Sequence, residues 1–214
     1  MTPRKYVKEI THAAKQLFEG LSYYHKYLTA IETPIFTTMY DDEAEFERKY
    51  KEWAKKNRKK LKEYDKNLQK YFGYAISKAA LCGAILQIAF TGMKLHARPR
   101  KKVPASCKAI FKGKENSEAK KYCIGRMVHD IPMGLIIYAA RNQYSHMDDK
   151  VYNPVTTNVF EHLTTFGTGG KYRNPQFDLQ VRKKEIYADN VLAILEWDNL
   201  ETFLKDMKEM LKCT

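Results

Sequence analysis

Apolar residues recur at spacings of three and four along most of this chain, and this helical period restricts its fold more than any other feature. Residues 4–32 carry such a stripe, which Pro34 ends. No run of alternating apolar and polar residues is long enough to predict a sheet, although residues 159–163 and 177–187 could each contain a short strand. The pattern therefore predicts an all-α fold.

The rest of the chain continues this pattern. A second helix is expected to start at Asp42 and to reach about residue 95, with a charged first half and an apolar second half. Residues 97–116 contain two prolines and a glycine and predict a basic loop. Further helices are expected at about 131–146, from Pro154 onward, and at about 188–212. We therefore expect residues 1–214 to form one domain, an antiparallel bundle of five to six helices.

The chain is strongly basic, with 38 Lys and Arg against 25 Asp and Glu and a net charge of +13. Two segments concentrate this charge: residues 48–70 hold eleven Lys or Arg and three acids, and residues 94–114 hold eight and no acid. Aromatic residues interleave the first segment, a combination that suits phosphate contact and base stacking. A solvated helix face and a disordered loop are the alternative. The residues expected to contact nucleic acid are Arg98, Arg100, Lys101, Lys102, Lys108 and Lys112.

The remaining composition indicates a cytoplasmic protein. The first residues contain no apolar stretch of the signal-peptide type. The four cysteines are widely scattered, form no CxxC pair and are expected to be reduced thiols. The apolar stretch 71–90 approaches the length of a membrane span, but Lys78 and Gln87 interrupt it, so a buried core helix without a membrane partner is the better prediction. No acidic cluster or Cys/His set offers a metal site, and no cofactor is expected.

A reactive side-chain set lies where the apolar helix 131–146 ends, in the sequence RNQYSH. Asn142 and His146 are four residues apart and share one helix face, so the amide could orient the imidazole. Arg141 is adjacent, and its guanidinium could stabilise a dianionic phosphorane while His146 moves protons. Such a pair suffices for metal-free cleavage of RNA, in which the 2′-OH is the nucleophile. The spacing by itself is weak, because a histidine that only caps a helix would look the same.

This segment resembles the R-x4-6-H motif of the HEPN superfamily, an all-α domain found in prokaryotic toxin and defence ribonucleases. In that family the arginine is typically followed by Asn, His or Asp, as Arg141 is followed here by Asn142. The resemblance implies a homodimer with two Arg/His pairs facing one cleft, and a possible antitoxin partner. It also implies that Arg141 holds the scissile phosphate, that His146 transfers protons and that Asn142 positions His146.

Two points of the sequence depart from the family's pattern or bear on its activity. Toxins paired with small nucleotidyltransferases usually carry Tyr two residues beyond the motif histidine, where this chain has Asp148. Asp148 and Asp149 also place negative charge beside a phosphate site, which could weaken RNA binding or change the protonation of His146.

The leading hypothesis is a homodimeric endoribonuclease that cuts RNA and leaves a 2′,3′-cyclic phosphate. A non-catalytic helical module that binds nucleic acid or protein is the alternative, and a helical scaffold without a nucleic-acid role is a third.

Overall fold

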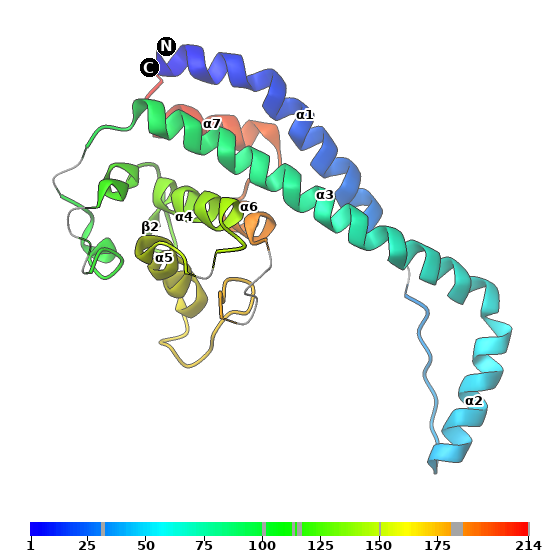
Figure 1. Ribbon diagram of the computed structural model, residues 1–214. Coiled ribbons are helices and arrows are strands. Elements are labelled where there is room, and N and C mark those ends of the chain that lie inside the picture. The colour runs from blue at the N-terminus through cyan, green and yellow to red at the C-terminus, as the bar shows by residue number, and fades with distance from the viewer. Residues whose placement is uncertain are drawn as a thin grey trace. The chain divides into compact units, whose positions relative to one another are not determined.

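The structure is a computed structural model that describes residues 1–30, 33–99, 102–112, 114, 117–149, 151–180 and 186–213. Within these ranges the chain forms seven α-helices, and the predicted all-α class is confirmed (Figure 1). The helices are α1 (Pro3–Thr29), α2 (Glu43–Lys56), α3 (Arg58–His96), α4 (Met133–Ser145), α5 (Pro154–Thr165), α6 (Ala188–Ile194) and α7 (Leu200–Met210). Two 3-10 helices, η1 (Ala105–Cys107) and η2 (Glu118–Tyr122), lie between α3 and α4.

The described residues also contain one small antiparallel sheet, which the sequence pattern did not predict. Strand β1 (Met127–Val128) pairs with β2 (Ile131–Pro132) across a turn of two residues, His129 and Asp130. Both turn residues have positive φ, at 48° and 61°, as a tight hairpin requires. Because β2 occupies the first residues of the range expected to be helical, α4 begins at Met133. The segment 159–163 lies within α5 and is not a strand.

Two of the expected helices are each divided in two, which explains why seven are found instead of five or six. The predicted helix from residue 42 to about 95 is interrupted at Asn57, whose side chain donates a hydrogen bond to the Trp53 carbonyl (2.9 Å). Asparagine competes in this way with the backbone hydrogen bonds of a helix. The predicted helix 188–212 is interrupted between α6 and α7, where Glu196 has a φ of 55° and Asn199 caps the restart.

The chain divides into two compact units. The main unit comprises residues 1–21 and 79–214, and the small unit comprises residues 22–78. Among the described residues, α3 is the one helix long and apolar enough, by length and composition, to span a membrane, and 44% of that apolar window is buried inside the structure.

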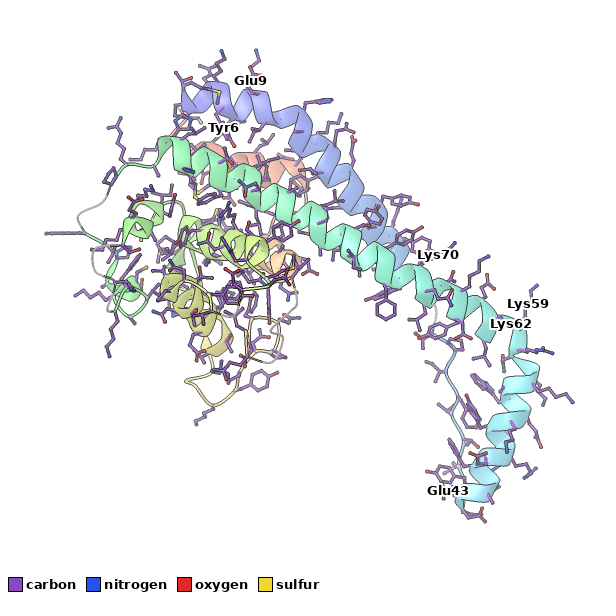
Figure 2. The ribbon with its side chains drawn as sticks, viewed as in Figure 1. Tyr6, Glu9, Glu43, Lys59, Lys62 and Lys70 are labelled. Atoms are coloured by element: carbon purple, nitrogen blue, oxygen red, sulfur yellow. The ribbon has the colours of Figure 1, made fainter. Side chains whose placement is uncertain are left out.

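In the main unit, the start of α1 packs on α3 and α7. The Tyr6 hydroxyl donates a hydrogen bond to the Ile88 carbonyl (2.6 Å), and Figure 2 shows Tyr6 between α1 and α3. Burial raises the pKa of Tyr6 to about 12. The rings of Phe18 on α1 and Phe203 on α7 lie 5.6 Å apart. These contacts fix the half of α3 that supports α4.

Helix α4 lies at the centre of the main unit. Its buried residues run from Met133 to Ala140 with only Tyr138 partly exposed, and α4 contacts α5, α6, η2 and β2. Gly134 permits the approach of η2, because a Cβ atom there would lie 2.6 Å from the Tyr122 carbonyl oxygen. The position of the α4 C-terminus is therefore determined by packing along its whole length.

The small unit is built on aromatic contacts. Asp42 caps α2 by accepting a hydrogen bond from the Glu45 backbone (2.7 Å). The extended segment 33–40 packs on α2 because the Phe36 ring contacts those of Phe46, Tyr50 and Trp53. The end of α1 contacts α3 through Tyr27 and Tyr74, whose ring centroids lie 4.4 Å apart.

The close approach at Gly134 gives a test of this packing. We expect Gly134→Ala to lower the free energy of unfolding by about 1–3 kcal/mol, because the new methyl group would displace the backbone of η2. Gly73→Ala is the matched control: no atom lies within 4 Å of its Cβ position, and alanine favours a helix interior by about 0.5–1 kcal/mol. Urea unfolding followed by circular dichroism measures both. Equal stability of Gly134→Ala and the wild type would contradict the close packing of α4 on η2.

Candidate active site at the end of helix α4

Arg141 is half-buried in the last turns of α4 and is held by two residues of α3. Its Nε donates a hydrogen bond to Gln87 Oε1 (2.9 Å), and the guanidinium carbon lies 5.0 Å from the centroid of the Phe90 ring. A guanidinium over an aromatic face gains a cation–π interaction, which is stronger where water is partly excluded. The guanidinium plane is therefore oriented by α3 before any ligand binds.

Asn142 connects Arg141 to the neighbouring helix. Its Oδ1 accepts a hydrogen bond from Arg141 Nη1 (3.3 Å), and its Nδ2 donates to Thr156 Oγ1 on α5 (3.4 Å). Thr156 is fully buried, so this contact holds the Asn142 amide against α5. The amide of Asn142 thus contacts Arg141 and α5, whereas the sequence suggested a contact with the imidazole of His146.

His146 is the C-cap of α4, and its imidazole is paired with Asp149. The backbone N–H of His146 still donates to the Asn142 carbonyl (3.0 Å), while Nδ1 of the ring lies 3.0 Å from Asp149 Oδ2. A hydrogen bond from the Asp149 N–H to the His146 carbonyl (2.9 Å) closes the turn that brings the two side chains together. Both side chains are about half exposed, at 52% and 55%.

The pairing with Asp149 assigns different roles to the two ring nitrogens. A carboxylate accepts a hydrogen bond from Nδ1–H, so the neutral ring keeps its proton on Nδ1 and presents the lone pair of Nε2. Nε2 on an exposed ring is able to accept a proton from a bound molecule. Asp149 therefore orients His146 in the way that a carboxylate orients the histidine of a proton-transfer pair.

Arg141 and His146 leave α4 in different directions. Five residues along an α-helix correspond to a rotation of roughly 140° and a rise of about 7.5 Å. One chain thus presents the guanidinium and the imidazole on different sides of the same helix end. A second copy of the site, or a ligand that passes around the helix end, would allow both groups to act on one phosphate.

The basic segment that follows α3 is anchored beside α5. Cys107, Ile110 and Phe111 are buried in the core of the main unit, and Asn158 on α5 donates a hydrogen bond to the Ile110 carbonyl (2.9 Å). This segment is therefore partly a 3-10 helix with core contacts, where the sequence predicted only a loop. Of the predicted nucleic-acid contacts, four are exposed: Arg98, Lys102, Lys108 and Lys112. Arg100 and Lys101 lie outside the described residues.

Three residues that hold the site were not identified from the sequence. Gln87, Phe90 and Thr156 lie ten or more positions from the motif, and no local pattern links them to it. Asp149 was expected from the sequence to place negative charge near His146, and its carboxylate contacts the imidazole in the structure. Among the residues that the structure describes, no group of three or more His, Cys, Asp or Glu side chains is placed to hold a metal ion.

The contact with Asp149 predicts which nitrogen of His146 carries the proton. At a pH where the ring is neutral, ¹⁵N NMR should find the Nδ1–H tautomer in the wild type, because Asp149 accepts that hydrogen bond. Asp149→Ala should shift the ring towards the Nε2–H tautomer. The adjacent Asp148→Ala is the matched control and should leave the wild-type tautomer unchanged. The same tautomer in all three proteins would show that Asp149 does not orient the ring.

Comparisons of the chain with protein-family models, with curated proteins and with solved structures find no match in any of the three. The function has to be inferred from the residues of the site and their geometry.

Proposed function

We propose that this protein is a metal-independent endoribonuclease, in which His146 transfers protons and Arg141 holds the scissile phosphate. The observation that carries the proposal is the exposed pair of His146 and Asp149, which leaves Nε2 free for proton transfer at the end of a buried helix. Arg141, held by Gln87 and Phe90 in the last turns of the same helix, supplies an oriented cation for a phosphate.

The proposed reaction uses the RNA itself as the nucleophile. Nε2 of His146 removes the proton of a ribose 2′-OH, and the 2′-oxygen attacks the adjacent phosphorus. The P–O5′ bond breaks, and the 5′-oxygen receives a proton that His146 can return, so the imidazole ends the reaction as it began. Arg141 stabilises the dianionic phosphorane through charge-assisted hydrogen bonds. The products are a 2′,3′-cyclic phosphate and a 5′-OH, and DNA is not a substrate because it lacks the 2′-OH.

The resemblance to the HEPN superfamily adds the proposal of a homodimer. Since Arg141 and His146 leave α4 about 140° apart, a second chain would allow the arginine of one copy and the histidine of the other to meet on one phosphate. The exposed Lys108 and Lys112 next to α5 would attract the RNA backbone. We place this enzyme in the cytoplasm, in a toxin or antiviral role, with an antitoxin protein as a possible partner.

A non-catalytic nucleic-acid- or protein-binding module is the second candidate. The observation that favours it is that Gln87, Asn142 and Phe90 all hold the Arg141 guanidinium, an arrangement that also suits a purely structural arginine. In that case His146 and Asp149 form an exposed helix-end pair of the kind that contributes little to stability. Binding assays do not separate the two candidates, whereas cleavage assays do.

Cleavage should depend on His146. With end-labelled RNA in EDTA, we expect the wild type to produce fragments and His146→Ala to leave the RNA intact, because proton transfer at the 2′-OH is lost. His12→Ala replaces another exposed histidine, on α1, and should cut like the wild type. Gel electrophoresis gives the rates. Intact RNA with the wild type, or equal cleavage by His146→Ala, would overturn the proposal.

Cleavage should also require a guanidinium at position 141. Arg141→Lys keeps the charge but loses the planar donor that binds Gln87 and covers Phe90, so we expect the cleavage rate to fall about a hundredfold. Arg4→Lys is the matched control at an exposed position of α1, outside the predicted nucleic-acid contacts, and should change the rate little. Single-turnover kinetics at saturating protein separates this effect from weaker RNA binding. A wild-type rate for Arg141→Lys would show that the guanidinium has no part in the reaction.

A further inference from the structure

The small unit contains a cavity of about 560 Å³ at the junction of α2 and α3. One wall is formed by residues 30 and 33–35, and the other by the end of α2 and the start of α3. The side chains on the helical wall are Trp53, Asn57, Lys60, Glu63, Tyr64 and Asn67. Its volume falls within the range of about 300–1,000 Å³ that is usual for sites that hold small organic groups. The interruption of the helix at Asn57 creates this wall, because it separates the directions of α2 and α3.

The aromatic side chains of the cavity suit the stacking of a nucleobase. The Trp53 ring packs against the rings of Phe36 and Tyr50, whose centroids lie 5.4 and 5.9 Å from its own. The Tyr64 ring is half-buried, and within the described residues it contacts no other aromatic ring. One aromatic group is therefore fixed by packing, while the second lines the cavity without an aromatic partner among the described residues. Base–aromatic stacking of this kind is tolerant of sequence, because every base has a π-face.

The polar side chains of the cavity suit the edge of a base. The Asn57 amide uses its Nδ2 on the Trp53 carbonyl, which leaves Oδ1 as an acceptor. Glu63 and Asn67 make no side-chain hydrogen bond with the described residues. A carboxylate and two amides provide both acceptors and donors for the exocyclic groups of a base. This set of groups fits a base better than a purely apolar ligand.

Unpaired positive charge is concentrated on the two helices that form the cavity, and Lys60 lines the cavity itself. In the first half of α2, three basic residues form i,i+4 ion pairs: Arg48 with Glu52, Lys49 with Glu45, and Lys51 with Glu47. From residue 55 onward the balance changes, since eight exposed basic residues have no ion-pair partner among the described residues. They are Lys55, Lys56, Arg58, Lys59, Lys60, Lys62, Lys66 and Lys70. Figure 2 shows Lys59 and Lys62 near the start of α3 and Lys70 further along it, and all three are exposed.

We propose that this cavity binds a base of single-stranded RNA, stacked on Tyr64 and Trp53, while Lys60 and the other unpaired basic residues from Lys55 onward contact phosphates of the same strand. Charge complementarity selects a polyanion, and the aromatic cavity selects one whose bases are unpaired. The identity of this strand as the substrate of His146 rests on the proposed function. Binding itself does not, because stacking and phosphate contact need no 2′-OH.

Single-stranded DNA separates the two proposals, since it can occupy the cavity but cannot be cleaved by 2′-OH attack. With a fluorescein-labelled oligodeoxythymidylate and the full chain, we expect fluorescence anisotropy to show binding that weakens steeply as salt rises. Tyr64→Ala should weaken binding about tenfold, because the stacking of one base on the tyrosine ring is lost. The matched control is Tyr71→Ala on the same helix, which is exposed at 39% and does not line the cavity, and it should bind like the wild type.

Two further measurements keep the proposal testable if Tyr64→Ala disturbs the fold. The oligonucleotide should quench the fluorescence of Trp53 in the wild type, because the only other tryptophan, Trp197, is 2% exposed in the main unit. Lys60→Glu at the rim should weaken binding more than Lys51→Glu, which lies outside the cavity. Absence of quenching, or equal effects of the cavity variants and their controls, would overturn the inference. RNA cleavage by the wild type would still support the proposed function in that case.

Discussion

The burial of α4 determines where every group of the candidate site can lie. This helix is apolar on nearly all sides because it is enclosed by α5, α6, η2 and β2, and Gly134 removes the one Cβ atom that would separate it from η2. A helix held along its whole length cannot rotate or slide without opening the core. The polar residues after Ala140 therefore emerge at a fixed place, and the candidate site lies at the end of a rigid element.

The two proposed catalytic groups are supported by different physical means. Arg141 is fixed by tertiary contacts, since Gln87 and Phe90 on α3 determine the plane of its guanidinium. His146 is fixed locally, by the turn that brings Asp149 to its Nδ1. Positive charge is likewise divided between a segment anchored beside α5 in the main unit and the helices of the small unit. In the proposed function, both units would therefore attract RNA, whereas the phosphate chemistry would belong to the main unit alone.

Helical periodicity was sufficient to predict the all-α class and the approximate place of α4, because apolar spacing reflects burial directly. It did not predict the breaks at Asn57 and Glu196, which depend on a side-chain hydrogen bond and on one backbone angle. The hairpin before α4 was not predicted because strands of two residues are too short to show an alternation of apolar and polar residues. The motif was visible in the sequence, but its supports were not, since Gln87 reaches Arg141 only through the tertiary fold.

In the proposed reaction, RNA is cut by attack of its own 2′-OH, with His146 as the proton-transfer group. The most direct measurement is mass spectrometry of the ends produced when pure wild-type protein is incubated with total RNA in EDTA. We expect 2′,3′-cyclic phosphates and 5′-hydroxyls, which arise when the 2′-oxygen displaces the 5′-oxygen. Fragments with 5′-phosphates and 3′-hydroxyls, or RNA that remains intact, would contradict it.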